Sequence, residues 1–145
     1  MLTKRAFLGL AAAALLAACA GPSDTSVQLT LTGAADMNGG APAQAKVYYL
    51  ADSSVFASAD FFAVFNDPQA TLGTDLIEVK TYQLSPGRTI ADTASFPAGA
   101  PAPKAIGIVG AFRNINGRFL AVRPLSPNAS NPVQASLSGN SVTLR

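Results

Sequence analysis

The stretch Val27-Gln28-Leu29-Thr30-Leu31-Thr32 alternates apolar and polar side chains without interruption. Successive side chains of a β-strand point to opposite faces, so this period of two predicts a strand that buries one face and exposes the other. Gly33 ends the pattern, and a loop with three glycines, one proline and an Asn-Gly-Gly run extends to Ala45. The folded domain, expected over residues 27–145, therefore begins with a half-buried strand.

Strand patterns continue along the chain. The further strands are expected at 46–50, 76–84, 88–96, 105–112, 118–123, 133–137 and 142–144. The stretch 105–112 is nearly all apolar, which predicts a central strand buried on both faces. The dipeptide Asn116-Gly117 is typical of a type I′ hairpin turn and is expected to connect this strand to the next.

A change of period marks residues 53–73. Phe61, Phe62 and Phe65 have helical spacing after Asp60, a candidate N-cap, and Asp67-Pro68 is typical of a second helix start. We expect one or two short helices here whose aromatic face packs on the sheet, in preference to stacking on a ligand. Eight strands with turn signals between most of them predict a mainly β fold, a two-sheet antiparallel β-sandwich with this helical insertion between strands 2 and 3.

The N-terminus has the features of an export signal. Lys4 and Arg5 precede the apolar stretch Ala6–Ala18, which is shorter than the roughly 20 residues that a membrane-spanning helix needs. The stretch ends in Leu16-Ala17-Ala18-Cys19, which resembles the lipobox of bacterial lipoproteins, where the cysteine thiol accepts diacylglycerol. We therefore expect a signal peptide at 1–18, and a lipidated Cys19 with a flexible tether at 19–26.

The charge balance argues against nucleic acid as a partner. The whole chain has 10 Lys and Arg against 8 Asp and Glu, but two of its basic residues, Lys4 and Arg5, lie in the expected signal peptide. Without them the domain is formally neutral and lacks the basic footprint of a nucleic-acid-binding protein.

The residue types that catalysis usually requires are scarce. The chain has no His, and its one Cys lies in the lipobox, which excludes Ser-His-Asp and Cys-His systems and the zinc sites built on His or Cys. Asp36 and Asn38 fall short of the six to eight oxygen ligands of calcium. The carboxylates mostly lie at expected caps, turns and exposed strand positions, so we expect no catalytic residues, no metal and no cofactor, and a protein that is not an enzyme.

The order of these features resembles the TssJ (SciN/VasD) family of outer-membrane lipoproteins of the type VI secretion system, from Leu29 to about Leu125. The matching pieces are Leu31–Asn38, Val47–Leu50, Phe56 with Ala59–Phe61, Leu72–Asp75, Leu84–Gly87 and Ile108–Arg113. Each piece is short, but their order and spacing together are fairly specific. One departure is Phe119-Leu120, which stands where the family usually has a Trp-Arg pair: phenylalanine keeps the aromatic packing, while Leu120 lacks the charge.

The resemblance implies a transthyretin-like sandwich that acts as a docking component. In that family the loop between the first two strands binds the periplasmic domain of TssM, an inner-membrane protein, and the lipid ties the complex to the outer membrane. The corresponding loop residues are Ala35, Asp36, Met37, Asn38 and Gly39. We expect the lipid-anchored protein on the periplasmic face of the outer membrane, with a TssM-like protein as its partner.

Two properties of the loop are expected. Asp36, Met37 and Asn38 should contribute more to binding than 41–43, and shortening 33–45 should leave the sandwich folded, because loop tips tolerate such changes. The hairpin tip at Asn116-Gly117 is the next candidate contact. The alternative functions are a periplasmic transthyretin-like lipoprotein that binds a small ligand or glycan or inhibits a protease, and a lipid-anchored hydrolase that uses carboxylates alone.

Overall fold

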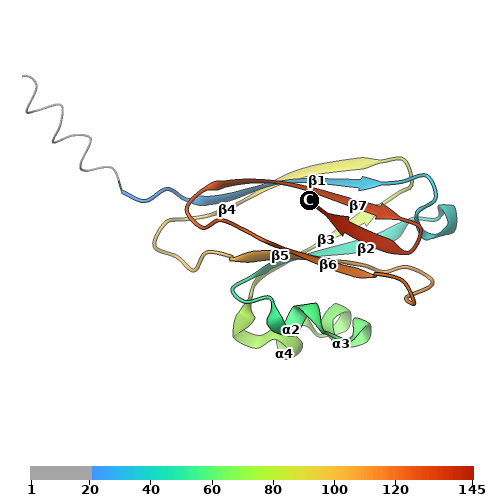
Figure 1. Ribbon diagram of the computed structural model, residues 1–145, viewed down its shortest axis with the longest axis horizontal. Helices are drawn as coiled ribbons and strands as arrows, with labels where there is room; N and C mark the ends of the chain where they lie inside the picture. The colour runs from blue at the N-terminus through green and yellow to red at the C-terminus, as the bar shows by residue number, and fades with distance from the viewer. Residues whose placement is uncertain (1–20) are drawn as a thin grey trace, which may run out of the picture.

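The computed structural model describes residues 21–145, so the expected signal peptide and the expected lipidation site, Cys19, lie outside the described residues. Eight strands form two packed sheets (Figure 1). The strands are β1 Thr25–Gly33, β2 Ala43–Leu50, β3 Leu76–Leu84, β4 Thr89–Phe96, β5 Ala105–Gly110, β6 Leu120–Pro124, β7 Ser130–Ser138 and β8 Ser141–Leu144. Sheet 1 has the order β4-β1-β7-β8 and sheet 2 the order β3-β2-β5-β6. The predicted two-sheet β-sandwich is confirmed.

The pairing of β1 with β7 departs from the expected antiparallel pattern. These two strands run parallel, with Ser26 opposite Ser130 and Gly33 opposite Leu137, while the other five pairings are antiparallel. A hairpin forces its two strands to be antiparallel, but β6 and β7 belong to different sheets. The connection between them crosses the sandwich and leaves the direction of β7 free.

The first strand starts two residues earlier than the sequence pattern predicted. Thr25 is 1% exposed, and its Oγ1 accepts a hydrogen bond from Asn128 N at 2.7 Å. Asp24 in turn accepts a hydrogen bond from the backbone of Ala98 at 2.9 Å. The expected tether segment 19–26 thus contributes its last two residues to the sandwich.

The type I′ turn predicted at Asn116-Gly117 is wrong, although β5 and β6 do pair. The strands are joined by nine residues, 111–119, and neither Asn116 nor Gly117 has a positive φ. Asn114 Oδ1 accepts from Asn116 N, and the carbonyl of Arg118 accepts from Val142 N. These contacts replace the tight turn with a wider loop.

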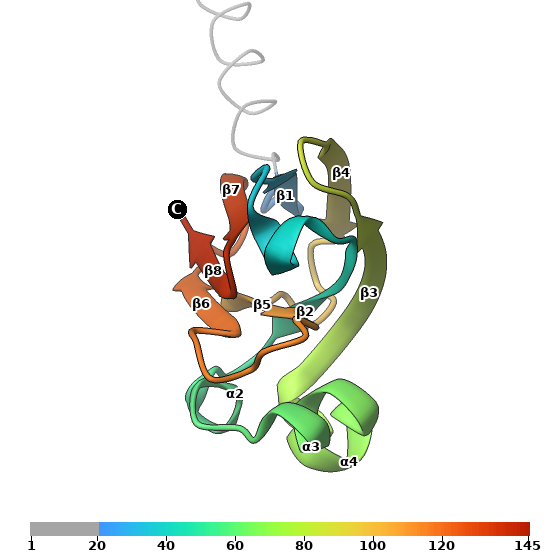
Figure 2. The same cartoon turned by 90° about the vertical axis from the view of Figure 1, so that its right-hand side faces the viewer.

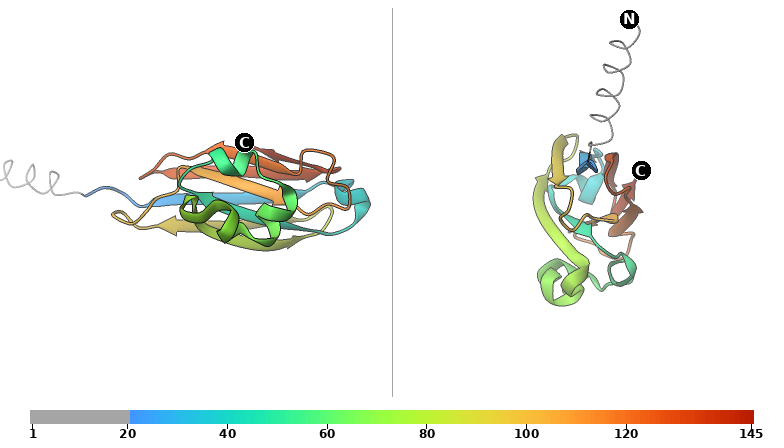
Figure 3. Two further views of the ribbon diagram at one scale, coloured as in Figure 1. Left: turned by 90° about the horizontal axis from the view of Figure 1, so that it is seen from below. Right: turned by 90° about the vertical axis from the view of Figure 1, so that its left-hand side faces the viewer.

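The helical insertion lies where it was predicted, but it has three short α-helices where one or two were expected, and Asp67 makes no side-chain cap to the last of them. It consists of α2 Ser54–Ala57, α3 Phe61–Asn66, α4 Pro68–Leu72 and a 3-10 turn, η2 Gly73–Asp75. Asp60 caps α3 by accepting a hydrogen bond from Ala63 N, and Pro68 opens α4. The helices lie across the outer face of sheet 2 (Figure 3).

Most of the phenylalanines of the insertion pack on the sheet, as expected. The Phe56 ring lies 5.0 Å from that of Tyr48 and fills the space above Gly107, where any Cβ would overlap it. Phe61 meets Phe119 edge-on at 5.5 Å, so Phe119 packs against the aromatic side chains of the insertion. Phe62 is the exception, since it is 59% exposed.

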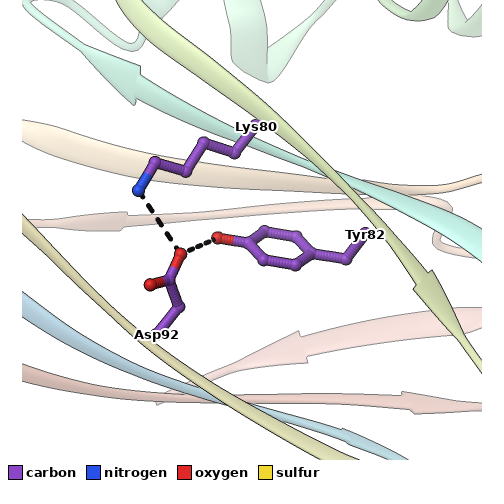
Figure 4. A network of polar contacts seen from close by, with 3 residues as sticks. All are labelled: Lys80, Tyr82 and Asp92. Atoms are coloured by element: carbon purple, nitrogen blue, oxygen red, sulfur yellow. Dashed lines mark hydrogen bonds and ion pairs between the residues drawn. The ribbon is translucent and has the colours of Figure 1, made fainter.

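A polar cluster joins the two sheets along one side of the sandwich (Figure 4). Lys80 and Tyr82 of β3 both donate to Asp92 Oδ2 of β4, at 3.3 Å and 2.5 Å, and these are edge strands of different sheets. The Tyr82 hydrogen bond and, to a smaller extent, Lys80 lower the pKa of Asp92. Burial and the bond to Asp92 raise the pKa of the Tyr82 phenol.

The lowered pKa of Asp92 predicts a stability change in acid. A carboxyl group whose pKa is lower in the folded state stabilises above its unfolded pKa of about 3.9, and this stability is lost as the pH falls through the folded pKa. Urea unfolding between pH 6 and pH 2 should show Asp92→Asn losing at most about 1 kcal/mol near neutrality, because the side chain is 37% exposed. As the pH falls through the folded pKa of Asp92, the stabilities of the variant and the wild type should converge.

The matched control is Asp67→Asn, since Asp67 makes no side-chain cap to α4. It should keep the wild-type dependence on pH. A constant stability difference between Asp92→Asn and the wild type across this range would contradict the assignment.

Candidate partner-binding site

Four loops gather at the end of the sandwich opposite the tether. β1 has nine residues, which span roughly 30 Å at about 3.3 Å per residue, and it leads from the tether to the loop 34–42. We define the distal tip as the loops 34–42, 85–88, 111–119 and 139–140. Figure 1 shows the tether and the distal tip at opposite ends, and Figure 2 looks onto the tip. The predicted partner-binding loop is therefore one of the two longest loops of this tip.

Met37 of this loop closes the end of the hydrophobic core. It is 0% exposed and belongs to the 3-10 turn η1 Met37–Gly40. Its sulfur lies so close to Gly33 that a Cβ on that glycine would come within 2.5 Å of it. Met37 therefore stabilises the loop from inside the domain and is not available for contact with a partner.

Asn38 connects three of the four loops of the distal tip. Its Oδ1 accepts from Arg113 N at 2.7 Å, its Nδ2 donates to the Pro42 carbonyl at 3.0 Å, and its backbone N–H donates to Gly139 O at 2.7 Å. Its φ of +49° lies in the left-handed region, which Asn tolerates better than most residues. Asn38 is 8% exposed, so its role in the structure is to hold the loops together.

The three other predicted residues, Ala35, Asp36 and Gly39, are exposed. Asp36 Oδ1 accepts a hydrogen bond from Ser138 Oγ at 3.3 Å, which ties the outer part of the loop to β7. A depression of about 310 Å³ lies beside Gly39. Its lining residues are Asn38, Gly39, Arg113, Asn114, Gly139 and Asn140. A partner would contact these exposed groups, while the buried side chains of Met37 and Asn38 hold the loop in position.

Because Met37 and Asn38 are buried while Ala35, Asp36 and Gly39 are exposed, two expectations about the loop change. Met37 and Asn38 were expected to be contact residues together with Asp36, but their side chains face the core and the neighbouring loops. Shortening the loop was expected to leave the sandwich folded, but it would remove a buried Met and three hydrogen bonds of Asn38. To test partner binding without unfolding the tip, point substitutions at the exposed positions are therefore better than shortening the loop.

Arginines at the distal tip were not recognised from the sequence. Arg88, Arg113 and Arg118 are exposed and lie in two of its loops, and the one ion pair among residues 21–145 is Lys80–Asp92. The loops come together only through sheet topology, so no local pattern groups these residues. Of the three arginines, only Arg113 could have been noticed in the sequence, because it ends the fragment Ile108–Arg113 that resembles the TssJ family.

Three of the described carboxylates accept hydrogen bonds from backbone N–H groups. Asp24 accepts from the backbone of Ala98, Asp52 from that of Ser54 and Asp60 from that of Ala63. Residues 21–145 contain no group of three His, Cys, Asp or Glu side chains placed to hold a metal ion. Over the same residues, no helix has the length and apolar character needed to span a membrane.

The chain is similar to lipoproteins of type VI secretion systems in both sequence and structure. A family model described as type VI secretion lipoprotein, VasD, EvfM, TssJ matches residues 25–140. The lipoprotein TssJ1 from Pseudomonas aeruginosa has 22% identity and a TM-score of 0.73, over 86% of this chain and 96% of that chain. Serratia marcescens Lip, a membrane-bound component of the type VI secretion system, has 23% identity and a TM-score of 0.71, over 86% and 97%.

A further matching chain occurs in a structure described as the C-terminal domain of the type VI secretion protein TssM from EAEC. It has 25% identity and a TM-score of 0.65, over 83% of this chain and 97% of that chain. Among the curated proteins, none matches the sequence.

Proposed function

The chain belongs to the family of type VI secretion lipoproteins that includes TssJ, VasD and EvfM, and on this premise we propose that it is a docking lipoprotein. In this proposal the acylated Cys19 anchors it in the outer membrane, on the periplasmic face. The distal tip binds the periplasmic domain of a TssM-like inner-membrane protein. The protein then connects the secretion complex to the outer membrane and has a structural role, not a catalytic one.

The observation that carries the proposal is the placement of the distal tip. β1 continues directly from the tether, and the predicted loop stands at the other end of this strand (Figure 1). The anchor and the recognition surface are thus separated by the length of a rigid sandwich. Asn38 and Met37 fix the loop beforehand, which lowers the entropy cost of binding.

The structure named for TssM also supports the choice of partner. The matching chain there is covered over 97% of its length by 83% of this chain, so the two are of similar size. A lipoprotein-like chain in a structure described by a TssM domain is what a complex of the two would contain. A second similar chain occurs in a structure described as the type VI membrane complex, with 26% identity and a TM-score of 0.67.

Substitution of exposed loop residues tests the proposal. The double variant Ala35→Trp, Asp36→Arg adds bulk and reverses charge on the surface, away from Met37 and Asn38. We expect it to weaken binding of the TssM-like periplasmic domain at least tenfold, or about 1.4 kcal/mol, because a mismatched side chain prevents close packing at an interface. Isothermal titration calorimetry with the full-length protein measures this affinity.

The control is Ala100→Trp, an exposed position in the connector 97–104 at the tether end. It should bind like the wild type. If the loop variant keeps its melting temperature and the wild-type affinity, the contact lies elsewhere and the distal tip is not the docking surface.

A further inference from the structure

The second side of the sandwich differs from the side closed by Lys80, Tyr82 and Asp92. Here β6 and β8, the other two edge strands, lie beside each other without forming a ladder (Figure 2). One backbone hydrogen bond joins them, from Val142 N of β8 to the carbonyl of Arg118, two residues before β6. A groove of about 640 Å³ runs along β6, between β8 and the segment that follows α2. The lining includes Ala57, Arg118, Leu120, Val122 and Leu144.

The hydrogen-bond phase of the β5–β6 ladder decides which backbone groups face this groove. Gly110 N donates to Phe119 O, and Leu125 N donates to Lys104 O, so both of these opposed pairs are hydrogen-bonded. Bonded and non-bonded pairs alternate along an antiparallel ladder. The registers Leu120↔Val109 and Val122↔Gly107 therefore belong to non-bonded pairs. The N–H and C=O groups of Leu120 and Val122 point away from β5, into the groove.

Edge strands with free backbone groups pair readily with other chains, and proteins usually block them. On the opposite side, β4 places the charged Asp92 between the sheets. On β6 the blocking residues, Arg123 and Pro124, lie only at its end, and Arg123 is engaged with the Pro132 carbonyl. From Leu120 to Val122, the edge of β6 therefore has apolar side chains, no blocking residue and backbone groups that are free to pair with another strand.

The shape and charge of the groove indicate what can occupy it. The edge of β6 is flanked by β8 and by the segment after α2, so a single strand reaches it more easily than the edge of another folded sheet. Arg118 lines the groove where β6 begins, is exposed, and makes no ion pair within residues 21–145. A carboxylate at that end of the incoming strand would pair with it.

We propose that the free edge of β6 binds an extended peptide segment of a partner protein by strand addition. The segment runs antiparallel to β6, exchanges backbone hydrogen bonds with Leu120 and Val122, and has apolar side chains at alternate positions and an acidic residue opposite Arg118. Backbone bonds provide affinity in this mode, and the side-chain positions provide specificity. This site is separate from the distal tip and does not depend on the docking function proposed above.

Amide hydrogen exchange of the full-length protein, measured by NMR, tests the proposal. The probe is the peptide acetyl-Thr-Val-Thr-Val-Thr-Asp-amide, and its control has Lys in place of Asp. In the free protein the amides of Ala121 and Arg123 should be protected, while those of Leu120 and Val122 should exchange quickly. Saturation with the probe should slow exchange at Leu120 and Val122 at least tenfold, and the Lys peptide should bind at least fivefold more weakly.

Two variants test the chemistry of the site separately. Val122→Pro removes an N–H that faces the groove without removing a bond to β5, and should weaken binding of the probe at least tenfold. Arg118→Glu should reverse the preference, so that the Lys peptide binds more tightly than the Asp peptide. Because this substitution does not alter the backbone of β6, it still tests the site if Val122→Pro does not fold. Unchanged exchange at Leu120 and Val122 at millimolar probe, or self-association through β6 in place of peptide binding, would overturn the proposal.

Discussion

Replacing Ile108 by aspartate is expected to unfold the domain. Ile108 is 0% exposed in β5 and lies opposite Val47 of β2 on one side and Ala121 of β6 on the other. The new carboxylate would have no cation or hydrogen-bond donor at this site, and burying an unpaired charge costs several kcal/mol. Because a domain of this size is stable by only about 5–15 kcal/mol, the loss takes most or all of its stability. Circular dichroism during thermal and urea unfolding measures it.

Two controls separate the buried charge from other effects of substitution. Ile108→Val removes one methylene group and should cost about 1 kcal/mol. Thr93→Asp places the same charge on an exposed position of β4 and should change stability by no more than about 0.5 kcal/mol. An Ile108→Asp protein with the wild-type melting temperature would show that this position tolerates a charge and that the core has been misplaced.

Replacing Cys19 by serine is expected to abolish membrane anchoring. A hydroxyl is a far weaker nucleophile than a thiol near neutral pH, so the serine side chain would not accept the diacylglycerol. The variant should incorporate no labelled palmitate, and it should remain unprocessed or appear as a soluble protein in the periplasm. Palmitate labelling followed by membrane fractionation measures both outcomes.

The specificity of the lipobox gives the control for this prediction. Ser23→Cys, made together with Cys19→Ser, restores a thiol four residues away from the expected acylation site and should not restore labelling. The folded domain begins at Thr25, so both variants should keep the wild-type melting temperature. Labelling of Cys19→Ser at the wild-type level would refute the assignment of Cys19 as the anchor.

The sequence predicted the elements whose pattern is local. The strand expected at 76–84 is β3 with the same bounds, because its ends are set by η2 and by the Ser85-Pro86-Gly87 turn. The helix starts at Asp60 and Pro68 were recognisable because capping depends on residues close in sequence. The central position of β5 followed from its uniform apolar character, and all six of its residues are buried.

Features that depend on distant contacts were predicted less well. A parallel β1–β7 pair is set by a connection between sheets, and the wide loop at Asn116-Gly117 is set by the Arg118–Val142 bond. In the candidate site, Asn38 was expected in the loop between the first two strands, and it lies there. Its burial could not be predicted, because it comes from Arg113 and Gly139, which lie 75 or more residues away in the chain.

The position of β1 determines how the domain carries mechanical load. β1 continues from the tether and is paired along eight residues with β4 on one side and along eight with β7 on the other. A pull between the anchor and the distal tip acts along this strand, parallel to its axis. The hydrogen bonds of both ladders, which lie across the strand, are then loaded in shear and share the tension, instead of opening one after another as in a hairpin that is peeled apart. In the proposed orientation, the strand that leads from the anchor is thus also the one best placed to resist being drawn out of the fold.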